Sequence, residues 1–431
     1  MRRRARKGGG RQVELTVESL GARGDGIAFH EGRPVFVPLS AAGDRMRVRL
    51  EAERGGGFRG EPLELLEEGK GRADPPCPHF GTCGGCQLQH LDAASYRAWK
   101  ESLIPEALQR QGVQAGVMRP AIYIPPATRR RAALAFRRQK DRVHLGFHQR
   151  QSSAVVDLST CLLLTPELFA LLEPLRQLLQ RSMTSHPLGD AVLLHAENGF
   201  DLLLLTPEPP DLAAREAFVQ FAAEQNVVRM SWAADQRVAP EPLFEREPPR
   251  LTFGEVPVTP PPGGFVQPSE EGEAALVAAV LDALPEEPKR IADLFAGCGS
   301  FTFPLSARAP VTAVEGDAAA LASLWAAARR SGLAGPVLVE QRDLVRQPLR
   351  PEELAAVDVV LFDPPRQGAR EQAREIADSD VLRVVAVSCS PGSFARDARL
   401  LIEGGYRLDW VQPVDQFPWA AHLELVACFS R

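Results

Sequence analysis

The chain has 431 residues, of which 45% are hydrophobic and 24% are charged, a composition ordinary for a globular protein. This composition excludes a fibrous repeat and a chain that is disordered throughout, and the length predicts two to four domains. The sequence contains no run of 18 apolar residues, so we expect neither a membrane span nor a membrane partner.

The net charge of −5 conceals an asymmetry along the chain. Residues 1–150 contain 27 Lys and Arg against 16 Asp and Glu, a balance of +11, whereas residues 151–431 have a balance of −16. A front part that binds a polyanion would explain this asymmetry. A solvated surface of uneven charge would explain it equally well, so charge alone leaves both interpretations open.

The seven cysteines are too few and too irregularly spaced for a secreted disulfide scaffold. Three of them lie within residues 77–86, and the other four are scattered. Because such thiols suit a reducing compartment, we expect a cytoplasmic protein.

The N-terminal part begins with a basic segment. Residues 1–11 hold six basic side chains and three consecutive glycines, which indicates a flexible cationic arm. Residues 12–68 then form short β-like runs separated by glycine-rich turns, a pattern typical of a small five-stranded barrel. Seven arginines from Arg23 to Arg59 suggest that one face binds RNA. A structural barrel with a solvated, charged surface is the alternative.

Residues 71–265 predict a central domain of mixed helices and strands. Two β-like runs between Arg129 and Arg150 carry eight Lys and Arg against one acid, and phosphate contact is the natural role for such a patch. Charge that guards an edge strand is the alternative, and we favour RNA. The other expected elements are helices at 93–111, 166–182 and 211–225, strands at 191–196, 200–205 and 227–232, and a proline-rich linker at 247–269.

From residue 270 onward, strand-like and helix-like segments alternate, which predicts a doubly wound sheet whose ligands bind at the carboxyl ends of its strands. A helix is expected at 318–330. The expected strands are 290–296, 311–315, 337–341, 358–362 and 382–388, followed by 407–413 and 423–429.

The first motif of this part is a glycine turn after a strand, Asp293-Leu-Phe-Ala-Gly-Cys-Gly-Ser300. Glycine there allows a tight turn and close approach of the backbone to a ligand. Glu315 ends the next strand and Asp343 follows the third. Turn, acid and strand order match the S-adenosylmethionine (SAM) site of class I methyltransferases, with Glu315 on the ribose hydroxyls and Asp343 at the adenine edge.

Three further motifs follow at the same predicted edge. Asp363-Pro-Pro-Arg366 comes directly after the fourth strand, and the arginine stands where amino-group methyltransferases carry an aromatic residue, which disfavours that substrate class. Cys389 ends the fifth strand, a position that favours a nucleophile over a structural thiol. Glu424 opens the last strand, where a carboxylate among apolar residues needs a partner or a chemical role.

The set Cys77-x5-Cys83-x2-Cys86, with Cys161 as a fourth thiolate, could hold zinc or an iron–sulfur cluster. Zinc ribbons usually offer two CxxC pairs and this chain has one. The spacing slightly favours a cluster and leaves zinc open.

Together these residues resemble the RNA 5-methyluridine methyltransferase family over nearly the whole chain. CGGCQLQH, FVQPS, DLFAGCGSFTFPL, DPPRQG, SCSPGSFARD and HLELV match its motifs in order. The resemblance implies an α/β multidomain protein with an OB-like TRAM barrel (12–68), a central domain with a [4Fe-4S] cluster (71–265) and a Rossmann-like SAM-dependent domain (266–431). It implies cluster ligands Cys77, Cys83, Cys86 and Cys161, and SAM-binding residues Gln267, Phe295, Ser300, Glu315, Asp343 and Asp363.

The resemblance also implies a mechanism. Uracil C5 is too weakly nucleophilic to take a methyl group unaided, and attack of Cys389 on C6 would activate it. Glu424 would then remove the C5 proton, and Asp363 would line the SAM and uracil pocket. A base must leave its stack to reach such a site, so we expect a looped or flipped uridine.

Three serines depart from the family pattern, at positions 269, 300 and 390, where the family commonly has asparagine. They affect substrate identity and SAM affinity more than chemistry. We expect a monomer that methylates uridine C5 in structured RNA, with 23S rRNA favoured. The alternatives are the tRNA T loop and, in another functional class, a catalytically idle RNA-binding or folding factor.

Overall fold

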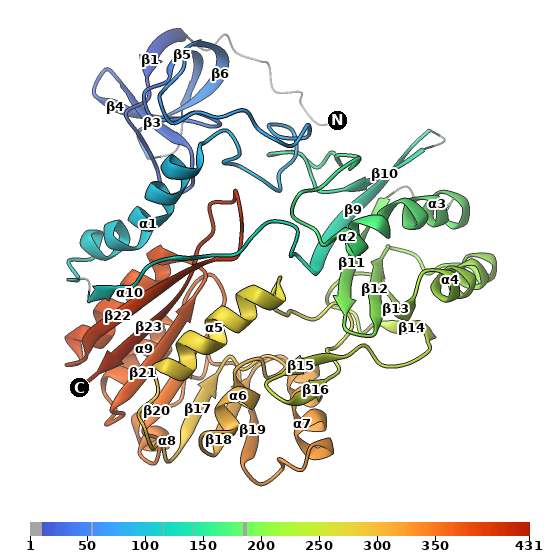
Figure 1. Ribbon diagram of the computed structural model, residues 1–431, viewed down its shortest axis with the longest axis vertical. Helices are drawn as coiled ribbons and strands as arrows, with labels where there is room; N and C mark the ends of the chain where they lie inside the picture. Colours follow the sequence, from blue (N-terminus) through green and yellow to red (C-terminus); the bar gives the residue numbers. More distant parts are fainter. Residues whose placement is uncertain (1–10, 53–54, 115, 141, 184–187) are drawn as a thin grey trace. The chain divides into compact units, whose positions relative to one another are not determined.

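The computed structural model describes residues 11–52, 55–114, 116–140, 142–183 and 188–431. Most of the predicted basic arm therefore lies outside the described residues. The chain forms two compact units, one containing residues up to 103 together with 419–421, and one containing 104–418 and 422–431 (Figure 1). No helix among the described residues has both the length and the apolar character that a membrane crossing requires.

The smaller unit contains the predicted barrel as a six-stranded sheet in the order β1-β5-β6-β4-β3-β2. Its β1 and β2 are separated by two residues, so one bent segment pairs with β5 at one end and with β3 at the other, which closes the sheet. Its strands are β1 (Gln12–Thr16), β2 (Ser19–Leu20), β3 (Gly26–His30), β4 (Arg33–Val37), β5 (Arg45–Ala52) and β6 (Phe58–Glu67).

The arginines of β5 are paired with acids rather than presented for RNA. Arg45 contacts Glu14 and Glu67, at 3.1 and 2.7 Å. Arg47 also binds Glu14, at 2.9 Å, and Arg49 binds the neighbouring strand in the same manner, through Glu61 at 2.7 Å. These cross-strand pairs favour the alternative interpretation for this part of the surface, a structural barrel with a charged exterior.

The segment between the barrel and helix α1 (Ala93–Arg110) carries three cysteines and has no strand or helix. Its residues Gln87 and Leu88 donate their backbone N–H groups to the carbonyl of Trp419, at 2.8 and 3.0 Å. The Gln87 side chain accepts the N–H of Ala421, at 2.9 Å. Residues 419–421 are thus part of this unit although they come from the C-terminal end of the chain.

The larger unit contains a second six-stranded sheet, in the order β10-β9-β11-β12-β13-β14. The strands expected at 191–196, 200–205 and 227–232 are confirmed, and the helix expected at 166–182 is present but interrupted at Leu171. The elements of this part are β9 (Arg131–Gln139), β10 (Arg142–Gly146), α2 (Pro166–Ala170), α3 (Leu172–Ser182), β11 (Leu188–Ala196), β12 (Gly199–Leu205), α4 (Leu212–Glu224), β13 (Val227–Ala233) and β14 (Glu241–Glu245).

The linker expected at 247–269 is not entirely irregular. It contains a short hairpin of β15 (Leu251–Phe253) and β16 (Val256–Val258), whose buried side chains join a core cluster with helix α7 (Ala318–Arg330). Three-residue strands are too short to show a readable alternation, and their stability comes from this packing.

The remaining strands form the predicted doubly wound sheet, in the order β19-β18-β17-β20-β21-β23-β22 with β7 and β8 beside β22. Strand β23 is antiparallel to both neighbours, and the strands from β19 to β21 are parallel. The bounds are β7 (Val117–Met118), β8 (Ile122–Tyr123), β17 (Ile291–Leu294), β18 (Val311–Glu315), β19 (Val337–Gln341), β20 (Val359–Phe362), β21 (Arg383–Ser388), β22 (Arg407–Asp415) and β23 (Glu424–Ser430).

Helices cover both faces of this sheet (Figure 1). Cys428 of β23 joins a buried cluster that contains Leu276, on the helix preceding the sheet, whereas its neighbour Phe429 packs on Phe394, with ring centroids 6.3 Å apart. Successive residues of a strand point to opposite faces, so these contacts define the two sides. The helices are α5 (Glu270–Asp282), α6 (Thr302–Ser306), α8 (Pro351–Leu354), α9 (Arg370–Ala377) and α10 (Pro391–Glu403), together with α7.

Candidate active site

Four of the predicted site residues, together with Asp293 of the glycine-turn motif, lie at one edge of the doubly wound sheet, where its parallel strands end and β23 begins. In open α/β sheets this edge is where ligands bind. The residues are Asp293 in β17, Glu315 at the end of β18, Asp363 after β20, Cys389 after β21 and Glu424 at the start of β23.

The strand register places Cys389 beside Glu424. Ser388 of β21 pairs with Leu425 of the antiparallel strand β23. The next position of that register sets Cys389 opposite Glu424, a relationship that brings two side chains close together. The side chains of Cys389 and Glu424 therefore lie close together only because β23, the last strand, runs antiparallel beside β21.

The glycine turn after β17 adopts an unusual backbone conformation. Phe295, Gly297 and Gly299 all have positive φ angles, of 63°, 56° and 103°. At Gly299 a Cβ atom would lie 2.5 Å from the ring of Phe303, so only glycine fits. Strain at a non-glycine residue such as Phe295 is typical of ligand-binding turns.

Glu315 is fixed by the same turn. One carboxylate oxygen accepts the backbone N–H of Gly297 at 2.8 Å, and the other accepts that of Asp317 at 2.7 Å. Each oxygen retains a second lone pair for a ligand hydroxyl. This arrangement suits the ribose-binding role that the sequence predicts.

Asp293 is fully buried beneath the turn. One of its oxygens accepts the hydroxyl of Thr302 at 2.5 Å, and the other has no hydrogen-bond partner among the described residues. Burial raises the pKa of Asp293 to about 7, and the charges of Asp363 and Glu315 add to this rise. An unsatisfied buried carboxylate oxygen is suited to accept a hydrogen bond from a ligand.

Burial also raises the pKa of Glu424, Asp363 and Cys389. It raises the pKa of Glu424 to about 8, to which Asp363 contributes, while a hydrogen bond from Gln416 opposes the rise. Burial raises the pKa of Asp363 to about 7. The pKa of the Cys389 thiol rises to about 12 through burial and the nearby Glu424 and Asp363, against an opposing effect of Arg366. Such perturbed groups gathered at one edge of a sheet indicate chemistry.

The loop that carries Arg366 is anchored to helix α10. Asp397 accepts the N–H of Ala369 at 2.8 Å, and a Cβ at Gly368 would lie 2.5 Å from the same carboxylate. Ser393 donates its hydroxyl to the carbonyl of Arg366 at 3.0 Å. Gly368 is therefore required for two reasons: its φ of 78° is unfavourable for other residues, and a side chain would collide with Asp397.

Gln267 is buried, and its side-chain oxygen accepts a hydrogen bond from Gln416 at 2.8 Å. Sequence reasoning missed Gln416, because a single glutamine in no motif gives no signal. Asp343 is exposed after β19, where its carboxylate accepts the N–H groups of Val345 and Arg346 at 3.1 and 3.3 Å. It lies at the predicted edge, in an exposed turn rather than a cleft wall.

Two arginines of the basic run hold the segment that contains Gln267. Arg130 binds Glu273 at 3.0 Å, and Arg131 donates to the carbonyls of Gly264 and Gly263 at 3.1 and 3.0 Å. These contacts correct the expectation that the run as a whole contacts phosphate. At least these two cations position the protein's own chain.

Two of the departing serines act as helix caps. Ser269 accepts the N–H of Gly272 at the start of α5, at 3.1 Å, and Ser390 accepts that of Ser393 at the start of α10, at 3.4 Å. Asparagine and serine are similarly good at this position, so both departures conserve the physical role. Ser300 is half-buried beside the glycine turn.

The cysteine segment forms a tight irregular loop in the smaller unit. The N–H of Cys83 donates to the carbonyl of His79 at 2.8 Å, and its sulfur accepts the N–H of Gly85 at 3.4 Å. Cys161 belongs to the larger unit, before α2. In the part of the chain that the structure describes, no three His, Cys, Asp or Glu side chains are arranged to hold a metal ion.

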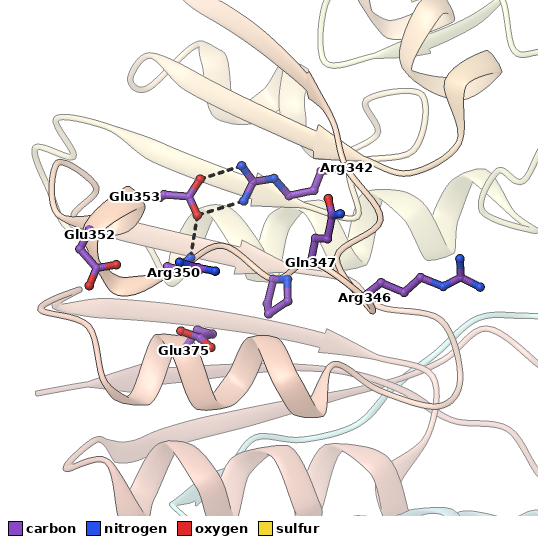
Figure 2. A pocket seen from close by; sticks show the side chains of 8 residues that line it. Arg342, Arg346, Gln347, Arg350, Glu352, Glu353 and Glu375 are labelled. Atoms are coloured by element: carbon purple, nitrogen blue, oxygen red, sulfur yellow. Dashed lines mark hydrogen bonds and ion pairs between the residues drawn. The ribbon is translucent and has the colours of Figure 1, made fainter.

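A pocket of about 680 Å³ lies between the loop after β19 and helices α8 and α9 (Figure 2). Arg342 forms a two-point ion pair with Glu353 there, at 3.0 and 2.6 Å. The lining contains three arginines and three glutamates and none of the predicted site residues. Its charges balance one another, so it offers no chemistry comparable with that of the sheet edge.

Comparisons with known proteins agree with this geometry. An uncharacterised RNA methyltransferase of Brucella suis biovar 1 is 39% identical over 419 residues, which cover 97% of this chain and 98% of that protein. The 23S rRNA (uracil(1939)-C(5))-methyltransferase RlmD of Aeromonas salmonicida is 33% identical over 97% of each chain. No protein-family model matches the chain.

The fold is that of a solved structure, the Pyrococcus abyssi tRNA (uracil-54, C5)-methyltransferase in complex with S-adenosyl-L-homocysteine. The two match with a TM-score of 0.74 and 22% identity, over 96% of this chain and 99% of that one. The sequence identity to the bacterial relatives over almost the full length establishes kinship, and the chain therefore belongs to the RNA 5-methyluridine methyltransferase family and is an RNA methyltransferase.

Proposed function

We propose that the protein transfers a methyl group from SAM to C5 of a uridine in structured RNA. The observation that carries this proposal is the meeting of a thiol, Cys389, with two carboxyl groups, Asp363 and Glu424, at the ligand-binding edge of the sheet. A nucleophile beside a base is what uracil C5 chemistry requires, because C5 becomes nucleophilic only after C6 has been attacked.

The first step is attack by Cys389. Its sulfur forms a bond to C6, and the C5–C6 electron pair moves toward C5 and O4 to give an enolate. Because the pKa of the thiol is raised to about 12, its proton must leave as the sulfur attacks. Asp363 is the acceptor beside it, so that Glu424 stays free to take a proton in the second step, and Arg366 favours the developing thiolate.

The second step is completed by Glu424. C5 forms a bond to the methyl group that SAM supplies, and the methyl–sulfur bond breaks. Glu424 then takes the C5 proton, the C5–C6 double bond re-forms and the C6–sulfur bond breaks, which frees Cys389. Burial makes Glu424 a stronger base once it is ionised, which suits this proton abstraction.

The residues at the edge fit a SAM molecule. The glycine turn leaves open space beside Gly297, Glu315 presents free lone pairs there, and Asp293 has an oxygen without a hydrogen-bond partner among the described residues. Gln267, Phe295, Ser300, Asp343 and Asp363 complete the proposed binding set.

The favoured substrate is 23S rRNA. A full-length relative has that activity in its name, and the chain has the barrel that the resemblance assigns to a TRAM domain. The barrel exposes Phe29, which is 51% accessible and suited to stacking on a base. Its domain, residues 12–68, together with the central domain, residues 71–265, would hold the RNA for the methyltransferase domain, residues 266–431.

We also propose a [4Fe-4S] cluster on Cys77, Cys83, Cys86 and Cys161. Its support is the crowding of three thiols into ten residues and the N–H group that Gly85 directs at the Cys83 sulfur, an interaction that stabilises a thiolate. The cluster would have a structural role, because the reaction contains no redox step. Anaerobically purified protein should be brown and contain iron; zinc at one equivalent without iron would overturn this assignment.

The function is tested by mapping 5-methyluridine in total RNA from cells with and without the gene. One 23S rRNA site should disappear on deletion, and loss of a T-loop site instead would assign tRNA. Purified protein should also form a covalent adduct with RNA that carries 5-fluorouridine, since the fluorine cannot be removed as a proton. If deletion leaves 5-methyluridine unchanged and the purified protein forms no adduct, the remaining interpretation is a catalytically idle RNA-binding factor.

A further inference from the structure

Gln416 is a buried glutamine directly after β22, 4% exposed, with no role in any sequence motif. Its side-chain nitrogen donates to the side-chain oxygen of Gln267 at 2.8 Å. Val414 of β22 pairs with Glu424 of β23, so Gln416, two residues further along, lies beside that carboxyl group and acts on it as a hydrogen-bond donor. One amide group therefore lies between a proposed methyl-donor contact and the proposed base.

The orientation of this amide is determined by its partners. An NH2 group has two hydrogens, so it can donate to Gln267 and to Glu424 at once. If the Gln416 amide were rotated by half a turn, its oxygen would face the oxygens of Gln267 and Glu424, and neither hydrogen bond could form. The Gln416 oxygen instead points toward helix α5 and has no hydrogen-bond partner among the described residues.

Gly272 provides the space for that oxygen. A Cβ atom at position 272 would lie 2.3 Å from the Gln416 oxygen, far inside van der Waals contact. The Gly272 N–H is already used by the cap residue Ser269, at 3.1 Å. A glycine in the first turn of a helix costs stability, and here it permits the amide to approach.

We propose that Gln416 is a positioning residue that couples donor binding to proton abstraction, because its single NH2 group orients both Gln267 and the carboxylate of Glu424. This inference rests on the proposed function. Occupation of the donor site fixes Gln267, Gln267 fixes the amide, and the amide favours the ionised form of Glu424. By linkage, ionisation of Glu424 must favour donor binding to the same extent.

The test compares Gln416→Met with Gln412→Met. Methionine keeps the length of glutamine and removes the NH2 group. Gln412, four residues earlier in β22, is a matched control, because it is also buried and donates to two backbone carbonyls, those of Pro120 and Pro413, at 2.7 and 3.1 Å. A second variant, Gly272→Ala, displaces the amide while leaving Gln416 in place.

The first measurement is the pH profile of methylation with saturating SAM and uridine RNA. Gln416→Met and Gly272→Ala should lose about tenfold in rate at neutral pH, and the acidic limb should move to higher pH. Adduct formation with 5-fluorouridine RNA needs no C5 proton removal and should stay within about twofold. Gln412→Met should match the wild type in both measurements.

The second measurement is the affinity for S-adenosylhomocysteine as a function of pH. This ligand has a neutral sulfur, so a direct charge effect on Glu424 is absent. Wild-type affinity should rise several-fold as Glu424 ionises, and Gln416→Met should remove that dependence. An unchanged pH profile in Gln416→Met, or an equal loss in Gln412→Met, overturns the coupling. Failure of the wild type to methylate or trap uridine overturns the proposed function instead.

Discussion

Arg130 and Glu273 form an ion pair of 3.0 Å in which both side chains are about nine-tenths buried. Arg130 directly precedes β9 of the central sheet, and Glu273 lies in the first turn of α5. The pair therefore fastens the basic run to the segment that carries Gln267. A buried charge that loses its partner is strongly unfavourable.

The first prediction concerns this pair. Arg130→Ala should lower the free energy of unfolding by about 3–5 kcal/mol and weaken SAM binding, since Glu273 would remain buried alone. Urea unfolding and calorimetry measure the two effects. Arg399→Ala, which breaks the exposed pair with Glu403, should cost less than about 1 kcal/mol. Equal losses in the two variants would contradict a special role for the buried pair.

The second prediction concerns stability against pH. Burial raises the pKa of Asp293 to about 7, so the folded protein binds a proton that the unfolded chain has lost. The associated stability is present below pH 4 and is lost as the pH rises through 7. The raised values at Asp363 and Glu424 act in the same direction.

Asp293→Asn should isolate this effect. The variant should be less stable than the wild type at pH 5, because its buried NH2 group lacks an acceptor, and the deficit should shrink by about 1–3 kcal/mol by pH 8. Chemical unfolding at several pH values measures the change. For Asp343→Asn, at an exposed position, the free energy of unfolding should change with pH as it does in the wild type. A constant deficit for Asp293→Asn would contradict the raised pKa.

The edge of the sheet could be anticipated from the sequence for a physical reason. Buried parallel strands appear as continuous apolar runs, and the polar residues that follow them must lie at one edge. Asp363 and Cys389 were therefore placed correctly by pattern alone. The same reasoning could not find β7, because Val117 and Met118 form a strand only by pairing with a β22 that is distant in sequence.

Charge was harder to interpret than strand pattern. Arg131 and Arg47 are cations in basic stretches, which predicts phosphate contact, yet their partners are the glycine carbonyls before Gln267 and the carboxylate of Glu14. These partners come from other parts of the chain, and no local pattern identifies them. Gln416 could not be identified from the sequence for the same reason, since its partner Gln267 comes from a distant part of the chain.

The third prediction follows from the paired arginines of the barrel. Arg47→Gln and Arg49→Gln should change RNA affinity by less than about twofold and leave the slope of affinity against salt unaltered, because a guanidinium already paired with glutamate releases few counterions. Arg23 is exposed, and Arg23→Gln provides the comparison. Filter binding at several salt concentrations checks this. A slope reduced by about one in Arg47→Gln would show that the pair opens to bind phosphate.

The fourth prediction concerns the nucleophile. Arg366 lowers the pKa of Cys389 against the effects of burial and of two acids. Arg366→Gln should therefore slow alkylation of Cys389 by iodoacetamide and move its pH dependence upward, as mass spectrometry of the modified peptide would show. Arg374→Gln, which breaks an exposed pair with Glu371, should leave the alkylation rate unchanged. Faster alkylation in Arg366→Gln would mean that the guanidinium shields the sulfur instead.

The fifth prediction concerns the serine departures. Because Ser390 caps α10 directly after Cys389, Ser390→Asn should keep the cap, with unfolding free energy and adduct formation close to the wild type. Ser390→Ala should cost about 1 kcal/mol, and since the cap fixes the turn that follows β21, it should also slow attack on 5-fluorouridine RNA. Ser269→Asn should behave in the same way at α5, measured by SAM affinity. If either asparagine variant were impaired as much as its alanine counterpart, the serines would have a function beyond capping, and their departure from the family pattern would then bear on substrate choice.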